Sequence, residues 1–171
     1  VSDMVSTRSR AINEVLAAYC YRSVGLQAPD MRWTPTAVSA DLWQSAGLAG
    51  SLADHPAIIS PWVPGLQKIT PDTAAQKSAK LVIWYVVASF LRDWDVVGQD
   101  YDNLLRQADT GTLHHPDPGG ALYYRAMGEK TVYPPAVKSL NTLLNAAKNP
   151  QAAKVFGVWA KVLNAPSATW L

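Results

Sequence analysis

The longest apolar stretch of the sequence, LVIWYVVASFL at 81–91, limits the fold more than any other feature. Lys80 and Arg92 flank it with charges. Eleven residues at a helical rise of 1.5 Å cover about 16 Å, roughly half of a membrane span. A helix that is apolar on nearly every side is stable in water only where other elements cover it. The stretch therefore predicts a central core helix and no transmembrane segment.

The flanking residues predict where this central helix starts and ends. The tripeptide TPD at 70–72 combines a capping hydroxyl, a proline at the first helical position and an acid in the first turn. All three favour a helix start. The apolar pattern continues at least to Phe90 and, as a weaker stripe, to Ala108. We therefore expect a central helix over about residues 71–108.

Helical periodicity also marks both ends of the chain. Between Asp3 and Arg22 apolar residues recur at three- and four-residue spacing, and Gly25 follows as a stop signal, so a helix is expected within residues 1–25. Its expected core-facing side holds Val5, Ile12, Val15, Leu16, Tyr19 and Cys20, opposite Arg8, Arg10, Asn13 and Glu14. Further helices are expected at 121–127, 135–147 and 150–163.

Residues 26–69 form a proline-rich excursion between the N-terminal helix and the rest. The segment DHPAIISPWVPGLQ at 54–67 holds three prolines within nine residues, which excludes a continuous helix or a central strand. Only the stretch after Thr36 has a helical pattern there. No alternating run in the chain exceeds four residues, so no strand is expected.

These patterns predict one domain of the all-α class. A chain of 171 residues is long enough for one well-buried core and too short for two ordinary ones. The expected architecture is an irregular bundle of five or six helices around the central helix, with proline-rich extended segments. Its parts are the N-terminal helix (1–25), the excursion with a short helix (26–69), the helical core (70–164) and a tail (165–171).

The stretch RDWDVVGQDYDN at 92–103 places four aspartates and an asparagine around one glycine, as calcium loops do. Asp93, Asp95 and Gly98 match positions 1, 3 and 6 of an EF-hand loop. Positions 5 and 12 hold valine and leucine, so the bidentate acid is missing. We therefore interpret the stretch as the acidic outer surface of the central helix, facing the basic C-terminal third of this chain or of a neighbour.

A second cluster of chemically capable side chains is HHPDPGG, in which His114, His115 and Asp117 are metal-ligand types. A metal site needs three or four ligands on firm structure, and His55 is the only further histidine. A solvated turn explains the cluster more simply. We predict no metal site, and a small metal-dependent enzyme using the His114/His115/Asp117 loop is the third alternative for function.

No other motif predicts catalysis. The sequence holds no glycine-rich phosphate loop, HExxH, GxSxG or paired-cysteine motif. The single cysteine, Cys20, excludes an internal disulfide. We therefore predict a protein that is not an enzyme and has no cofactor. Because the chain begins at Val1, we expect that an initiator methionine or a leader has been removed, and the N-terminus itself predicts no compartment.

Charge and aromatic content indicate contacts with other molecules. Charged residues make up 16% of the chain, below the usual quarter, and there are seven Trp and seven Tyr, residues enriched in protein interfaces. From Asp93 to Asp117 six acids and one base give a net charge of −5, whereas from Gly119 to Leu171 six bases and one acid give +5. Such asymmetry favours pairing within one subunit or head-to-tail assembly.

The sequence thus predicts a structural or assembly subunit, most concretely a helical coat or nucleocapsid-type protein that contacts nucleic-acid phosphates non-specifically, in a virion or the cytoplasm. The expected partner is therefore another copy of the chain or the other subunits of a hetero-assembly. The alternative is a small non-catalytic subunit of a larger enzyme complex. Candidate phosphate contacts are Arg8, Arg10, Arg22, Lys138, Lys148, Lys154 and Lys161. Candidate interface residues are Asp93, Asp95, Asp100, Asp102, Trp33, Trp62 and Trp170.

Overall fold

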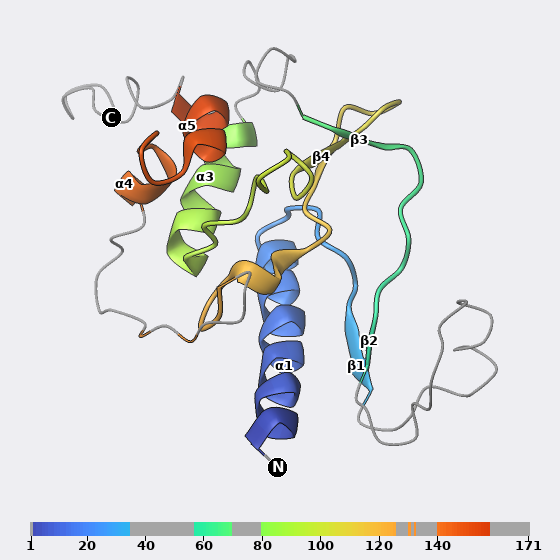
Figure 1. Cartoon of the computed structure of the whole chain (residues 1–171). Coiled ribbons are helices and arrows are strands. Elements are labelled where there is room, and N and C mark those ends of the chain that lie inside the picture. The colour runs from blue at the N-terminus through green and yellow to red at the C-terminus, as the bar shows by residue number, and fades with distance from the viewer. Residues whose placement is uncertain are drawn as a thin grey trace.

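The computed structural model describes residues 2–34, 57–69, 80–125, 130, 132 and 140–157 of the chain, and these residues combine helices with strands (Figure 1). The helices are α1 (Ser2–Ser23), α3 (Lys80–Leu91), α4 (Leu140–Leu143) and α5 (Pro150–Phe156), with a 3-10 turn η2 at Pro118–Gly120. Five short strands form two antiparallel sheets. The expected all-α bundle of five or six helices is therefore wrong, because the described fold is mixed α/β.

The strands belong to two separate sheets. In the first, β1 (Arg32–Thr34) pairs with β2 (Ala57–Ile59), with Trp33 opposite Ile58. The second has the order β3-β4-β5, with β3 at Leu66–Lys68, β4 at Leu105–Gln107 and β5 at Leu113–His114. The prediction that the chain has no strands is therefore wrong. Each strand has only two or three residues, which is too short to produce the alternating pattern by which a strand is recognised in a sequence.

The N-terminal helix is confirmed, and its stop is the predicted one. Gly25, at φ +80°, closes α1 as its N–H donates to the Arg22 carbonyl (2.9 Å) and the Leu26 N–H donates to the Tyr21 carbonyl (3.1 Å). This pair of bonds is a Schellman motif, which requires a left-handed residue after the helix. Glycine adopts that conformation without a steric penalty.

The central helix is shorter than expected. The same pair of closing bonds ends α3 at Leu91: the Arg92 N–H donates to the Ser89 carbonyl (3.2 Å) and the Asp93 N–H to the Ala88 carbonyl (2.8 Å). Arg92 supplies the left-handed residue at φ +58°. No glycine marks this stop, and the helix expected to run to residue 108 gives way to turns after 91 and to β4. Its expected start at residue 71 lies outside the described residues.

The hydrophobic core lies where α3 meets α1, α4 and α5 (Figure 1). The apolar stretch at 81–91 supplies Leu81, Trp84 and Ala88, all at most 2% exposed, so its prediction as a core helix is confirmed. Among the described residues, no helix is long and apolar enough to cross a membrane. Other fully buried members are Tyr21, Val96, Leu104, Leu143, Val155 and Phe156.

The face that α1 turns to the core is not the one expected from its large apolar residues. The buried positions are Ala11, Ala17, Ala18 and Tyr21, with Asn13 beside them. The larger Ile12, Leu16 and Tyr19 lie on the opposite side and are 44%, 48% and 65% exposed. We call these three residues the α1 outer face. Small alanines let the helix backbone approach the core closely, which the count of large apolar residues did not reveal.

Candidate functional site

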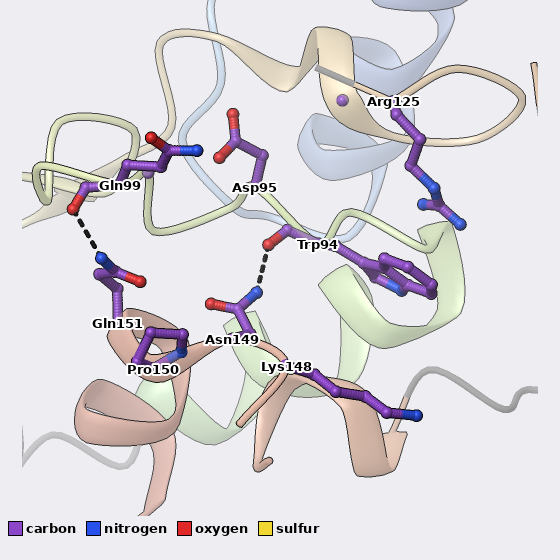
Figure 2. A pocket seen from close by; sticks show the side chains of 10 residues that line it. Trp94, Asp95, Gln99, Arg125, Lys148, Asn149, Pro150 and Gln151 are labelled. Carbon is purple, nitrogen blue, oxygen red and sulfur yellow. Dashed lines mark hydrogen bonds between the residues drawn. The ribbon is translucent and has the colours of Figure 1, made fainter. Parts of the chain in front are cut away.

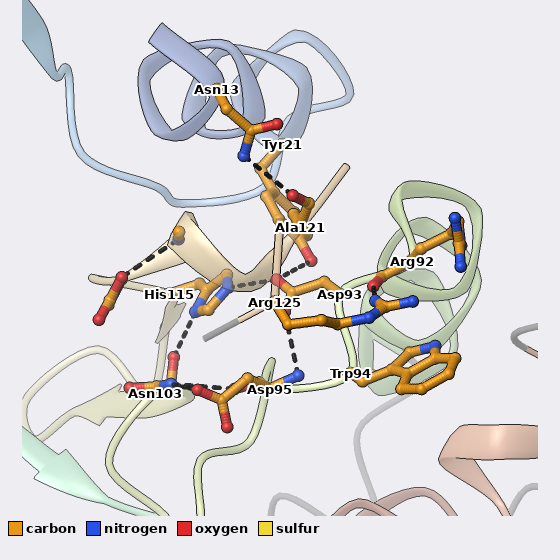
Figure 3. A network of polar contacts seen from close by, with 12 residues as sticks. Asn13, Tyr21, Arg92, Asp93, Trp94, Asp95, Asn103, His115, Ala121 and Arg125 are labelled. Atoms are coloured by element: carbon orange, nitrogen blue, oxygen red, sulfur yellow. Dashed lines mark hydrogen bonds and ion pairs between the residues drawn. The ribbon is translucent and has the colours of Figure 1, made fainter. Parts of the chain in front are cut away.

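A fully buried polar network centres on Asp93 (Figure 3). The closing turn of α3 directs this carboxylate inward, where its Oδ2 accepts a hydrogen bond from the Tyr21 hydroxyl (2.9 Å). The same oxygen lies 2.7 Å from Nε2 of His115, and both side chains are completely buried. Burial of charged groups is costly unless they are paired. Asp93 thus joins α1, the end of α3 and the segment after β5.

His115 is held as a cation by its neighbours. Its Nδ1 lies 2.5 Å from the backbone carbonyl of Asn103, which can only accept, so this nitrogen carries a proton. Nε2 faces the Asp93 carboxylate, which also accepts. Burial opposes the charged form, but the Asp93 charge and hydrogen bond and the Asn103 carbonyl outweigh it and raise the pKa of His115.

The network lies in the interior of the fold. His115 and Asp93 have no exposed surface. Burial, followed by the charge of Asp93, raises the pKa of Tyr21 well above its usual value, so the phenol stays a donor. The rings of Tyr21 and Trp84 stand nearly perpendicular to the imidazole of His115. Their centroids lie 5.1 Å and 6.2 Å from the imidazole centroid, respectively. This enclosure keeps water from the ion pair and strengthens it.

The three side chains considered as metal ligands, His114, His115 and Asp117, form other polar contacts in the structure. Both nitrogens of His115 are engaged in hydrogen bonds, and Nε2 of His114 lies 3.2 Å from Gln107 Oε1. Asp117 instead caps η2 through the Gly119 N–H (3.1 Å). Within the described ranges no group of three His, Cys, Asp or Glu residues is placed to hold a metal ion. His55 lies outside those ranges.

Residues 92–104 form a loop, which corrects their interpretation as the outer surface of a helix. Asn103 Nδ2 donates to the backbone carbonyl of Asp95 (3.0 Å) and to its carboxylate (2.9 Å), which ties the two ends of the loop together. Gly98 sits between them at φ +78°. Asp93, matched to position 1 of a calcium loop, is turned away into the core and is not a surface acid.

The acidity of Asp95 in the loop is perturbed by its surroundings. Burial, then the charges of Asp93 and Asp117, raise its pKa to about 6. A carboxyl group whose folded pKa lies above its unfolded value holds its proton more tightly in the folded state. Asp95 therefore increases the stability of the folded state as the pH falls through about 6. His115, whose pKa is also raised, acts in the same direction, because its stabilising charge is lost as the pH rises through its folded value.

We therefore expect the protein to be more stable at about pH 5.5 than at about pH 8. The Asp95 part should be about 0.5 kcal/mol, because pH 5.5 lies only a little below its folded pKa of about 6 and this carboxyl is only half-buried. Urea unfolding followed by circular dichroism at both pH values measures the difference. In Asp95→Asn the difference should shrink, and an unchanged difference in this variant would contradict the assignment to Asp95.

A cavity of about 500 Å³ adjoins the loop (Figure 2). Asn149 and Gln151, at the start of α5, donate side-chain hydrogen bonds to the backbone carbonyls of Trp94 and Gln99, the second at 3.0 Å. The guanidinium of Arg125 lies over the Trp94 ring at 3.7 Å from its centroid. The cavity thus lies between the 92–104 loop and the turn that leads into α5. Its lining also includes Asp95, Gly98, Gly120, Lys148 and Pro150.

Among the residues that the structure describes, the predicted phosphate contacts do not lie together. Arg8 lies over the Trp33 ring (5.0 Å), and Arg22 pairs with Asp30. Arg8 and Arg10 point about 200° apart around α1, since each residue turns the helix by about 100°. Lys148 and Lys154 belong to α4–α5, remote from the N-terminus of α1 (Figure 1). Lys138, Lys161 and Trp170 lie outside the described residues.

The interface candidates are placed differently from one another. Trp62 is 88% exposed, and Asp100 and Asp102 are exposed on the loop. Asp95 lines the cavity and Trp33 is partly covered by Arg8. Sequence reasoning missed Tyr21, Asn103 and Arg125, which act through long-range contacts. Only Tyr21 had a signal, since it follows Ala17 by four residues on one helix face.

Comparisons with known proteins give no family. No protein-family model, no curated protein and no solved structure matches this chain. A functional argument for this chain therefore depends on its geometry alone. Two features of the described residues enter that argument, namely the α1 outer face and the cavity beside Trp94.

Proposed function

We propose that this protein is an assembly subunit that associates with further copies of itself through the α1 outer face. The observation that carries the proposal is the two-sided apolar character of α1. One side of the helix packs into the core through Ala17 and Tyr21, while Ile12, Leu16 and Tyr19 are 44% to 65% exposed. Exposed apolar surface that is contiguous is typical of protein interaction sites.

The α1 outer face continues into a groove. A cavity of about 360 Å³ lies between Ile12 and Leu16 on one side and Tyr123 and Tyr124 on the other. Asn13 fixes this arrangement, because its Nδ2 donates to the Ala121 carbonyl (2.9 Å) and its Oδ1 accepts from the Tyr123 N–H (3.1 Å). A groove with tyrosines and aliphatic side chains on a rigid support resembles the centre of a protein interface.

A second apolar face supports repeated contacts. On α3, Ile83, Val86 and Phe90 are 46% to 59% exposed and lie opposite the buried Leu81 and Ala88. Two such faces on different helices suit heterologous contacts, in which one copy presents one face and the next copy the other. The exposed acids Asp100 and Asp102 and the basic segment 119–171 add charge complementarity to that arrangement.

The finer version of this proposal, a coat or nucleocapsid-type protein, depends on phosphate contacts. The described basic candidates are spread over α1 and α4–α5, so a single phosphate-binding stripe would need Lys138 and Lys161 to complete it. The runner-up is a non-catalytic subunit of a larger enzyme complex, which would use the same α1 outer face on a different partner. The oligomeric state of the purified chain separates these two.

We expect Leu16→Asp to weaken self-association by about tenfold or more, because a contact that buries leucine would then bury an unpaired carboxylate. Size-exclusion chromatography with light scattering, over a range of protein concentrations, measures the effect. The folded state should keep its stability, since Leu16 is 48% exposed.

Ala146→Asp is the matched control, because it adds the same charge at an exposed position after α4. It should associate as the unmodified protein does. A chain that stays monomeric at the highest concentration would overturn self-assembly, whereas equal effects of the two variants would show that charge, and not the α1 outer face, governs association.

A further inference from the structure

A second cavity is formed where the end of α1, the connection between β2 and β3, and the β4–β5 hairpin come together. Its volume is about 680 Å³, which falls within the range of ligand pockets, roughly 300–1,000 Å³. The lining comes from residues 22–30, from residues 60–66 and from the residues around β4 and β5. Of the described lining residues, none belongs to the α1 outer face, so the proposed assembly function leaves this cavity unused.

Backbone hydrogen bonds hold the three walls of the cavity at a defined separation. The His115 N–H donates to the Gln27 carbonyl (2.9 Å), which fixes the segment after α1 to the segment that follows β5. The Ala108 N–H donates to the Gly65 carbonyl (3.2 Å), which continues the β3–β4 ladder and fixes the second wall. The cavity is therefore formed before a ligand binds, and this lowers the entropic cost of binding.

Most of the cavity lining is apolar. Each of the three walls contributes one proline, namely Pro29, Pro61 and Pro116. Proline has no backbone N–H, so these positions present carbon surface and no donor. Aliphatic side chains from the β2–β3 connection, β3 and β4 complete this surface, namely Val63, Leu66 and Leu105. Such a lining favours a ligand with an apolar body.

The charged groups of the lining are paired or directed elsewhere. Arg22 pairs with Asp30, and both line the cavity. Asp102 turns its Oδ1 toward Gly98, within the 92–104 loop. Burial lowers the pKa of His114, so its imidazole is mainly neutral at neutral pH. An ionic ligand would lose its hydration here without gaining a partner, so the lining favours an uncharged ligand.

Trp62 supplies the aromatic surface of the cavity. It is 88% exposed although it lines the cavity, so almost none of its indole is covered within the chain. Aromatic rings gain from packing against one another, and proline rings dock on aromatic surfaces. A planar aromatic ligand packed between Trp62 and the proline walls covers this indole, whereas an aliphatic ligand forgoes the contact between rings.

We propose that this cavity binds a small molecule with an uncharged, planar aromatic ring system, which stacks on Trp62 and packs against the proline and leucine side chains. The volume admits such a ring system, the fixed apolar walls favour its body, and the exposed indole gives it a stacking surface. The proposal does not depend on self-assembly, because the α1 outer face takes no part in it.

Three naphthalene derivatives with the same rings test the proposal. These are 2-naphthalenemethanol, which is neutral, 2-naphthoate, which is an anion, and 2-naphthylmethylamine, which is a cation at neutral pH. A ¹H–¹⁵N spectrum follows binding through the Gly65 backbone amide and the Trp62 indole N–H. The neutral compound should give saturable shifts with a dissociation constant of about 0.1–1 mM, and each charged compound should bind at least about fivefold more weakly. The Trp94 indole signal should not move, because Trp94 lines the other cavity.

Variants at exposed aromatic positions locate the binding site. Trp62→Ala should weaken the binding of 2-naphthalenemethanol by about tenfold, and Trp62→Phe, which keeps an aromatic ring, by no more than about threefold. Both variants should keep the stability of the fold, because Trp62 is 88% exposed. Tyr19→Ala removes an exposed aromatic residue of the α1 outer face and should leave binding unchanged. Shifts that do not saturate, tighter binding of either charged compound, or equal effects of Trp62→Ala and Tyr19→Ala would overturn the proposal.

Discussion

Replacing Asp93 with alanine is expected to lower the free energy of unfolding by about 3–5 kcal/mol. The variant leaves a charged imidazole and the Tyr21 hydroxyl in a site with no exposed surface and without their common acceptor. A buried charge that loses its partner costs far more than the pair itself contributes. Urea unfolding followed by far-ultraviolet circular dichroism measures the loss.

Asp100→Ala is the control for this experiment. Asp100 carries the same charge on the same loop but is exposed, so its substitution should change stability by no more than about 0.5 kcal/mol. If Asp93→Ala cost no more than this control, the carboxylate would not be the centre of the network.

The pairing of Asp93 with His115 is tested by a double-mutant cycle. Because each single variant leaves an unsatisfied partner and the double variant removes both, the losses should fall short of additive by about 2–3 kcal/mol. Asp93→Ala, His115→Ala and their combination are the three variants to unfold in urea. Additive losses would show that the two side chains contribute separately.

The features that sequence reasoning predicted correctly carry local signals. The eleven apolar residues at 81–91 indicate a buried helix wherever they occur, and Gly25 supplies a helix stop that needs no tertiary contact. The helix within 1–25 and the core helix are confirmed for this reason. The start of α5 is equally local, since Asn149 caps the helix through the Ala152 N–H (3.1 Å) and Pro150 follows it.

The features that sequence reasoning missed depend on contacts between residues far apart in the chain. Arg92 adopts φ +58° without the glycine that usually marks such a stop, so the end of α3 had no local signal. The stop in turn directs Asp93 inward to His115, 22 residues away. The cavity beside Trp94 could not be predicted for the same reason, because Trp94 and Arg125 come into contact only in the folded chain.

The buried face of α1 shows a different limit. Periodicity identified the helix correctly but selected the large apolar residues as its core-facing side. Ala17 and Ala18 are buried instead, while Leu16 is half-exposed. Close packing of a helix against a core selects small residues when the backbones approach. A helix with apolar residues on both sides therefore indicates two packing surfaces. The spacing of these residues alone does not show which of the two is buried within the chain.

Gly98→Ala is expected to cost about 2–4 kcal/mol of stability and to disturb the 92–104 loop. Two effects add at this position. The backbone has φ +78°, where any other residue is strained, and a Cβ atom would overlap Asp102 Oδ1 and lie 3.0 Å from the Asn103 nitrogen. Urea unfolding followed by circular dichroism measures the loss.

Gly65→Ala separates the two effects. Gly65 has a similar φ of +74°, but no atom lies within 4 Å of the added Cβ, so this variant should show only the backbone strain of about 1–2 kcal/mol. The excess loss in Gly98→Ala then measures crowding inside the loop. Adding Asp102→Ala to Gly98→Ala should recover the part caused by the flexible carboxylate, and the remainder belongs to the Asn103 backbone. Equal losses for Gly65→Ala and Gly98→Ala would mean that the loop relaxes around the new methyl group.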